Sequence, residues 1–166
     1  MTRLCQQLCA REPMGGTRLQ FEVTRTLAAS NDDIWKVLGN FGSEHRWSKA
    51  LVHCERDTPE VRVGTARICQ LPRSLMGRTQ VREVLIEFVP GRTLAYRLDG
   101  PAGPFVSASS RWSTNDRGNT TAVTVEGYFE PKHWAARAIV WPMVRPMLRR
   151  LTQRVLGELE EFLLAT

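Results

Sequence analysis

The sequence predicts a single α+β domain in which an antiparallel sheet of about seven strands packs against one long C-terminal helix. Two observations lead to this prediction. Short segments between residues 17 and 129 have the alternation of strands and are joined by short turns, which favours an antiparallel meander. After Pro131 the apolar residues recur every three or four positions, which is the period of a helix. A chain of 166 residues is long enough to bury one self-sufficient core.

The first elements are a strand and one or two short helices. Residues 17–27 alternate apolar and polar side chains and are expected to form a half-buried strand. Ser30 then precedes a run of acidic residues, as at a capped helix N-terminus, so a short helix is expected up to Leu38. Glycines end this helix, and residues 43–47 are expected to form a second short helical turn.

Six further strands are expected in the middle of the chain, each bounded by Pro, Gly, Asn or Asp. Their expected spans are 51–56, 64–71, 79–89, 93–99, 105–114 and 120–129. Together with the first strand they make a sheet of about seven strands. A sheet of this kind needs a helix to cover one of its faces.

The final helix is predicted from one apolar stripe, formed by Trp141, Val144, Leu148, Leu151, Val155, Leu159 and Phe162. A helix of about 24 residues from Pro142 would be roughly 36 Å long. Pro142 and Pro146 each lack a backbone N–H, so a kink or a restart is expected between residues 141 and 146. Residues 132–140 are then expected to form a separate turn or a shorter helix.

Composition narrows the class of protein. The net charge is +6, but the arginines are scattered, so nucleic acid is not an expected partner. One cluster, Arg145, Arg149, Arg150 and Arg154, favours a solvated helix face, with contact to an anionic membrane as the alternative. No apolar run is long enough for a membrane span. Residues 1–16 lack the apolar run of a signal peptide, so they are expected to be a disordered leader of a cytoplasmic protein, with Met14 as an alternative start.

The cysteines and histidines predict neither a metal site nor a cofactor. Cys5, Cys9, Cys54 and Cys69 contain no CxxC pair, and free thiols are expected, buried in the case of the two that lie in predicted strands. The three histidines have no metal-binding spacing.

Three segments have a recognisable order of features: FEVTRTLAASNDDIWKVLGNFGSEHRW, VGTARICQL and VREVLIEFVPGRTLAYRLDG. The first leads from a strand into a capped helix and an aromatic-rich turn. It resembles the opening of the helix-grip superfamily, which includes START-related, SRPBCC and birch-pollen-allergen-like proteins. The other two are similar to strands of its polyketide cyclase/dehydrase-like branch, and the resemblance covers residues 17–165. It implies a helix-grip fold, in which the curved sheet wraps around the last helix.

The resemblance also implies a cavity between the sheet and the last helix that holds an apolar or amphipathic ligand. Strand alternation suggests which residues face it, and on residues 79–89 it groups Arg82 with Val84, Ile86 and Phe88, leaving Glu83 and Glu87 in water. The candidate ligand-binding residues are Trp47, Arg82, Tyr96, Ser110, Trp112, Trp134 and Trp141.

Each candidate has a purely structural alternative. Tyr96 and Trp112 are also typical core residues, and Trp141 would equally serve to anchor the helix. A register slip of one residue would turn Arg82 to solvent. No catalytic motif such as GxSxG is present, so no catalytic residue is assigned.

We therefore expect a carrier or sensor of a hydrophobic or amphipathic small molecule. Two alternatives stay open. One is an enzyme of the polyketide cyclase, aromatase or dehydrase type on the same scaffold. The other is a membrane-peripheral lipid or quinone chaperone that docks through the arginine-rich face of the last helix.

Overall fold

The computed structural model describes residues 18–75 and 78–165, without the side chains of residues 73–78. The expected leader at 1–16, with Cys5 and Cys9, lies outside the described residues. In chain order the elements are β1 (Leu19–Leu27), α1 (Asn31–Leu38), the short 3-10 helix η1 (Glu44–Arg46), β2 (His53–Arg56), β3 (Ala66–Leu75), β4 (Arg78–Val89), β5 (Thr93–Leu98), β6 (Phe105–Asp116), β7 (Thr121–Pro131), the π-helical segment η2 (Ala136–Val140) and α2 (Trp141–Leu164).

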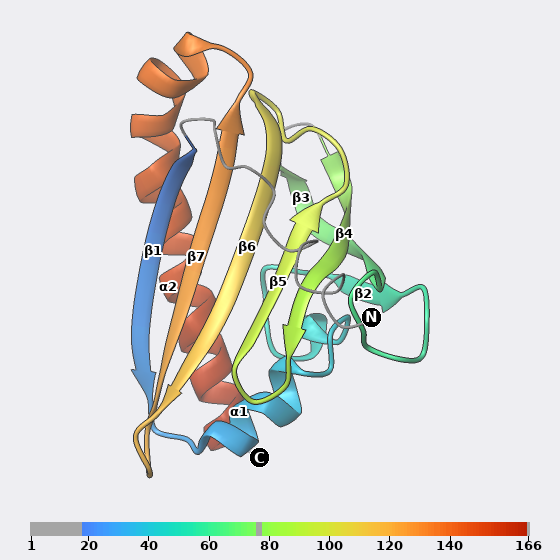
Figure 1. Cartoon of the computed structure of the whole chain (residues 1–166), viewed down its shortest axis with the longest axis vertical. Coiled ribbons are helices and arrows are strands. Elements are labelled where there is room, and N and C mark those ends of the chain that lie inside the picture. Colours follow the sequence, from blue (N-terminus) through green and yellow to red (C-terminus); the bar gives the residue numbers. More distant parts are fainter. Residues whose placement is uncertain (1–17, 76–77, 166) are drawn as a thin grey trace, which may run out of the picture.

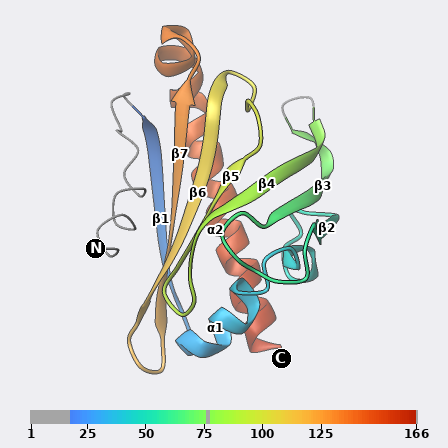
Figure 2. The same cartoon turned by 45° about the vertical axis from the view of Figure 1, so that its right-hand side comes forward.

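The seven strands form one antiparallel sheet in the order β1-β7-β6-β5-β4-β3-β2. Because β1 pairs with β7, the first and last strands lie side by side at one end of the order and β2 forms the other edge. Figure 1 and Figure 2 show the sheet curving around α2, with α1 beneath one end of the strands. The predicted fold class is confirmed.

The short helix α1 closes one end of the core. Ser30 caps it by accepting a hydrogen bond from the Asp33 N–H at 3.2 Å. Ile34 and Trp35 are buried, and the Trp35 indole N–H donates to Thr114 Oγ1 at 2.8 Å. The helix is thereby tied to β6.

The long helix α2 is held at both of its ends. Near its start, Trp141 packs against Phe105 and Phe129, with ring centroids 6.2 and 5.2 Å apart. Near its end, Leu156 and Leu159 are fully buried. Between these two anchors, the residues of α2 that face the sheet are only partly buried.

Of the two expectations for the prolines near the start of α2, the structure has the separate short segment before the helix, but Pro146 does not end the helix. The separate short segment before it is present as η2, which leads directly into α2 at Trp141. Pro142 lies in the first turn of α2 and does not interrupt the passage from η2. Pro146, in contrast, lies inside α2 without ending it.

The expected orientation of Arg82 is wrong. The pairing of β4 with β5 shifts between Leu85 and Glu87, which marks a β-bulge or similar irregularity. An extra residue at this point reverses the alternation. Residues before the bulge therefore point to the opposite face from the one that counting back from Phe88 predicts. Leu85 is fully buried and Ile86 is 43% exposed.

Arg82 therefore lies on the outer, solvent-facing side of the sheet. Its guanidinium donates to Asp99 Oδ2 at 2.6 Å and lies 3.7 Å from Asp57 Oδ2. Glu83, which the alternation placed in water, has a side chain only 16% exposed. Glu87 does lie on the outer face, where Arg111 binds it.

The prediction of free thiols is also wrong for the two described cysteines. Cys54 and Cys69 are buried as expected, but they form a disulfide between β2 and β3. The register of these strands places the two residues directly opposite each other, with Cα atoms 4.2 Å apart. Their position in neighbouring strands, and not a short sequence motif, brings the two sulfurs together.

Loss of this disulfide is expected to destabilise the domain. The bridge spans 15 residues, and closing a loop of this length stabilises a folded protein by about 3 kcal/mol. Urea unfolding with and without a reductant measures the difference. The Cys54→Ser/Cys69→Ser double variant should unfold at the same urea concentration as the reduced protein, and adding reductant should not change its midpoint. If neither reduction nor the double substitution lowers the midpoint, the bridge does not have the proposed structural role.

Candidate functional site

A cavity of about 190 Å³ lies between the concave face of the sheet, the loop that follows η1 and the middle of α2. Each of these three parts contributes side chains to its wall. The lining residues are Glu44, Trp47, Ser48, Ala50 and Leu51 from η1 and its loop, Arg67, Glu83, Tyr96, Ser110, Trp112 and Val125 from β3 to β7, and Leu151, Thr152 and Val155 from α2.

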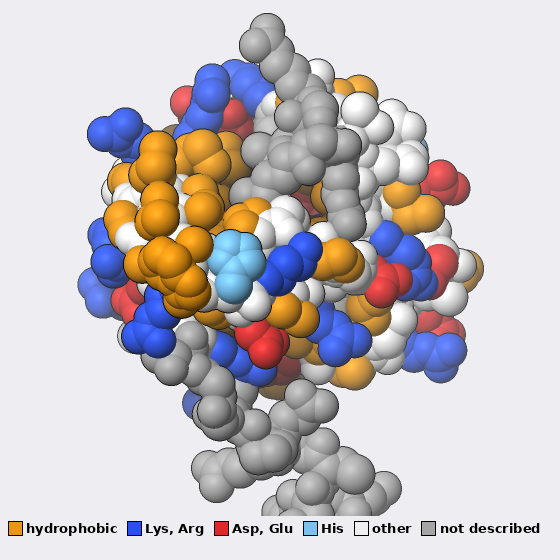
Figure 3. All heavy atoms as spheres, turned by 90° about the horizontal axis from the view of Figure 1, so that it is seen from above, with side chains coloured by type: hydrophobic (Ala, Val, Ile, Leu, Met, Phe, Trp, Pro, Cys, Tyr) orange, Lys and Arg blue, Asp and Glu red, His pale blue; other side chains and the backbone are white. Residues whose placement is uncertain are grey.

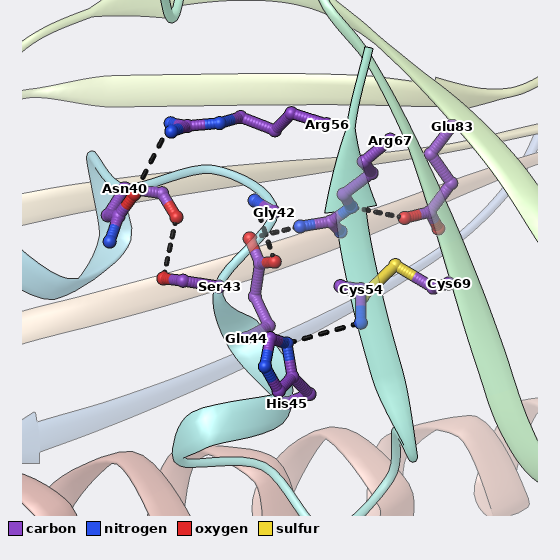
Figure 4. A network of polar contacts seen from close by, with 10 residues as sticks. All are labelled: Asn40, Gly42, Ser43, Glu44, His45, Cys54, Arg56, Arg67, Cys69 and Glu83. Atoms are coloured by element: carbon purple, nitrogen blue, oxygen red, sulfur yellow. Dashed lines mark hydrogen bonds and ion pairs between the residues drawn. A yellow bond between two sulfur atoms is a disulfide. The ribbon is translucent and has the colours of Figure 1, made fainter. Parts of the chain in front are cut away.

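A buried arginine is the main polar feature of this wall. The Arg67 side chain is only 5% exposed; its Nε donates to Glu83 Oε2 at 2.7 Å and its terminal nitrogen pairs with Glu44. Figure 4 shows Glu44 and Glu83 approaching Arg67 from opposite sides. Burial alone lowers the pKa of Arg67, but the two carboxylates outweigh it and raise the pKa above its ordinary value. The guanidinium therefore stays charged.

Aromatic rings cover the faces of the same guanidinium. Its central carbon lies 4.2 Å from the ring centroid of Phe41 and 4.4 Å from that of Tyr96. A planar cation in contact with two ring faces is stabilised by their quadrupoles. Arg67 thus links β3, β4 and β5 with the turn that precedes η1.

A glycine makes the approach of Glu44 feasible. Gly42 has a φ of +97°, and its N–H donates to Glu44 Oε2 at 2.9 Å. A Cβ at this position would lie 2.4 Å from Arg56 Cγ. Both the positive φ and the close contact require glycine here.

Two further contacts hold the loop wall in place. The Cys54 N–H donates to His45 Nδ1 at 3.1 Å, which ties η1 to the disulfide-bonded edge strand (Figure 4). The buried carboxylate of Glu158 on α2 accepts from the Lys49 N–H at 2.9 Å and from Ser48 Oγ at 3.2 Å. The loop is therefore fixed to both the sheet and α2.

The remaining polar groups of the wall are uncharged. Burial raises the pKa of Tyr96, and the charge of Glu83 adds to this effect, so the phenol is protonated at neutral pH. Trp47 and Trp112 pack edge to face with centroids 6.4 Å apart. The indole Nε1 of each is buried, and neither makes a hydrogen bond of good geometry within the described part of the chain. That of Trp112 is directed toward the Tyr96 hydroxyl and favours its ionised form, an effect smaller than that of burial.

The charges in the wall do not favour an anion. Arg67 supplies one positive charge, and Glu44 and Glu83 supply two negative charges, all within one contact network. Every ion pair that Arg67 makes is to these carboxylates. A negatively charged ligand would meet an excess of negative charge at short range.

The structure brings together four of the seven candidate residues. Trp47, Tyr96, Ser110 and Trp112 line the cavity; that they bind a ligand remains a prediction. Arg82 lies on the outer face, as described above. Trp134 is 75% exposed and Trp141 is part of the aromatic anchor of α2, so neither belongs to the cavity wall.

The sequence analysis missed the three charged residues of the wall. Arg67 alternates with exposed Ile68 on β3, so an apolar residue faces water while the cation faces the core. This inverted pattern is visible in the sequence. It identifies Arg67 as a buried cation only once the strand register, which places Glu83 opposite Arg67, is known. Glu44 depends on the turn at Gly42, which strand alternation does not predict.

Two other kinds of feature are absent from the described residues. None of their helices is long and apolar enough to cross a membrane. Nor do the described His, Cys, Asp and Glu side chains form any group of three or more that would hold a metal ion.

Replacing Arg67 is expected to destabilise the fold strongly. In Arg67→Met two carboxylates stay behind without their cation, which costs about 3–5 kcal/mol for a buried pair. Urea unfolding measures the loss, with Arg82→Met as the matched control: its ion pairs are exposed and are worth less than about 1 kcal/mol. Equal losses in the two variants would contradict the buried role of Arg67. Adding Glu44→Gln and Glu83→Gln to Arg67→Met should recover part of the stability.

Both tyrosines of the chain are expected to ionise late. Besides Tyr96, burial followed by the hydrogen bond and charge of Glu126 raises the pKa of Tyr128 to about 12. An unfolded tyrosine titrates near pH 10. Their stabilising contribution is therefore complete below about pH 10 and is lost as the pH rises through the folded pKa values. Absorbance titration should show little tyrosinate at pH 10 in native protein and half-ionisation in guanidinium; half-ionisation of the native protein at pH 10 would refute this assignment.

Solved structures of similar fold are found over most of the chain. An uncharacterized protein from Bacillus thuringiensis is 18% identical with a TM-score of 0.70, and the match covers 88% of this chain and 99% of that one. Ara h 8.0201 is 15% identical with a TM-score of 0.69, and the match covers 90% of this chain and 99% of that one. The di-domain ARO/CYC BexL from the BE-7585A biosynthetic pathway is 14% identical with a TM-score of 0.71, and the match covers 87% of this chain and 49% of that one.

At these identities the structural matches establish the fold, and they confirm the helix-grip architecture that the sequence resemblance implied. The comparison with curated protein sequences gave no match. A family model does match residues 18–163, nearly the whole described chain. The chain therefore belongs to the polyketide cyclase/dehydrase and lipid transport family.

Proposed function

We propose that the cavity binds a neutral hydrophobic or amphipathic small molecule and that the protein acts as its carrier or sensor. The observation that supports this most directly is the cavity itself, an internal space walled by the sheet, the loop after η1 and α2. Membership of a family that includes polyketide cyclases, dehydrases and lipid-transport proteins supports the same class of ligand.

The size of the cavity limits the ligand. Its volume of about 190 Å³ is below the roughly 300–1,000 Å³ of pockets that take drug-sized molecules. In this conformation the space suits a ligand of one or two rings. Apolar contacts would come from Leu51, Val125, Leu151 and Val155, and the two indole rings would provide flat surfaces for stacking.

The polar groups indicate what the ligand carries. A buried N–H without a partner destabilises the protein, so a ligand oxygen that accepts from Trp47 or Trp112 would gain affinity. Carbonyl and hydroxyl oxygens are such acceptors, whereas a carboxylate would be repelled by Glu44 and Glu83. We therefore favour a neutral ketone, phenol or quinone-like compound over a fatty acid.

A second candidate function is an enzyme of the cyclase or dehydrase type on the same scaffold. Tyr96 favours it, because its protonated phenol lines the cavity and can donate a hydrogen bond to a carbonyl oxygen of a substrate. Ser110, which pairs with Tyr96 across β5 and β6, would orient such a substrate.

Charge selectivity tests the proposal with two probes of the same aromatic body. Neutral 2-acetylnaphthalene should bind, and the anion 2-naphthoate should bind at least about tenfold more weakly, because of the excess negative charge. Fluorescence titration measures both affinities. Glu83→Gln removes one negative charge from the wall and should therefore reduce the difference in affinity between the neutral and the anionic probe. Equal affinity of the two probes would contradict the charge argument.

A matched pair of variants on β6 locates the bound probe. Ser110→Phe should fill the cavity and abolish binding of the neutral probe, whereas Val106→Phe, at a position 50% exposed, should not. Undiminished binding in Ser110→Phe would place the probe elsewhere and refute the proposal. Native mass spectrometry of freshly purified protein should then identify any ligand that co-purifies.

A further variant, Tyr96→Phe, separates a carrier from an enzyme. The enzyme proposal would replace the carrier proposal if the protein converts a polyketide mimic to an aromatic product and if Tyr96→Phe loses this turnover while it still binds the probe. Binding without turnover supports the carrier or sensor.

A further inference from the structure

An exposed apolar stripe runs along η2 and the first half of α2. Its members are Trp134, Ile139, Met143, Met147 and Leu151, exposed by 75%, 57%, 73%, 45% and 38%. The last four recur at every fourth residue, which on a helix gives one continuous face. Figure 3 shows the hydrophobic side chains gathered over the end of the molecule where β7 passes into α2. Contiguous apolar surface of this kind typically marks an interaction site.

The same segment carries only positive charge. Residues 131–157 contain no Asp or Glu, and their six cations are Lys132, Arg137, Arg145, Arg149, Arg150 and Arg154. All six are exposed. Among the described residues Arg154 alone of these has an ion pair, with Glu158 at 3.5 Å, whereas Arg25, Arg67, Arg82 and Arg111 of the sheet are all paired. Of the cations in this segment without an ion pair, Arg150 lies on the same side of α2 as Met143 and Met147, whereas Arg145 and Arg149 lie toward β1 and β7, in a pocket with Glu22 and Glu126.

We infer that this face docks onto an anionic membrane surface. An interfacial helix has apolar and aromatic side chains on one side and Lys or Arg at the rim, which is the arrangement found here. Long basic side chains keep their charge at the headgroups while their stems pack on apolar surface. Arg150 lies three residues after Met147, so cation and apolar side chain share one face.

The charge argues against a second copy of the chain as the occupant. Two copies joined through this face would bring Lys132 and Arg150 of each copy close together, and residues 131–157 contain no acidic residue to pair with them. An anionic bilayer satisfies both the apolar and the cationic side chains. The stripe also ends at Leu151, which lines the cavity, so docking would bring one wall of the cavity next to the lipid. The inference concerns the outer face and does not depend on which ligand the cavity holds.

Trp134 provides an internal reporter for the test. The other four tryptophans, Trp35, Trp47, Trp112 and Trp141, are each less than 10% exposed. Vesicles of phosphatidylcholine with phosphatidylglycerol should therefore shift the emission of Trp134 to the blue, and brominated acyl chains should quench it. Phosphatidylcholine alone should produce neither effect, and Trp134→Phe should lose both signals while the protein still sediments with anionic vesicles. Binding should weaken with rising salt.

Paired variants test the two parts of the surface by sedimentation. Lys132→Gln/Arg150→Gln should weaken binding by about fivefold for each cation removed, whereas Arg92→Gln/Arg117→Gln, also exposed, should weaken it far less. Ile139→Ser/Met143→Ser should weaken binding more than Val52→Ser/Val63→Ser, two residues each 59% exposed outside the stripe.

Three outcomes would overturn the inference. The first is equal binding to neutral and anionic vesicles, and the second is equal loss in test and control variants. The third is the absence of vesicle binding together with a dimer in sedimentation velocity that Ile139→Ser/Met143→Ser dissociates, which would make the stripe an interface between copies of the chain.

Discussion

The buried cation of Arg67 is the constraint on which the rest of the structure depends. Taking a guanidinium out of water costs several kcal/mol, and taking two carboxylates with it adds to that cost. The charge is tolerable only because Glu44, Glu83 and two ring faces surround it at contact distance. These partners come from η1 and the turn before it, from β4 and from β5, so the cation determines how three separate parts of the chain meet.

The other polar contacts extend this arrangement around the cavity. Gly42 orients Glu44, and His45 connects the same turn to Cys54 and through its disulfide to β3. On the opposite side Glu158 fixes the loop to α2. A buried polar network of this kind specifies one geometry, where apolar packing alone tolerates several. Among the described residues that line the cavity, Arg67 is the one cation and both neighbouring carboxylates bind it, which is why the proposed ligand is neutral.

The sequence predicted the order of elements well because each depends on a local pattern. Alternation, turn residues and the Ser30 cap act within a few residues, and so does the stripe of α2. Tyr96, Ser110 and Trp112 lie together on the cavity wall because β5 and β6 pair without a register shift around Tyr96, as the alternation assumed. Arg82 was misplaced because a bulge cannot be recognised from alternation alone. The disulfide and the pair of Arg67 with Glu83 depend on register between strands, which no single segment encodes.

The packing of α2 explains how a cavity of this size would admit a larger molecule. The helix is anchored through Trp141 at one end and through Leu156 and Leu159 at the other, and the turn with Leu151 and Val155 spans the cavity between them. Pro146 removes one backbone hydrogen bond just before that turn, which weakens the helix where it has the fewest buried contacts. A bend at this point would leave both anchors and the Arg67 network in place. Because Met147 and Leu151 of the apolar stripe lie in the same turns, contact with a lipid surface would act on the part of the wall that is easiest to move.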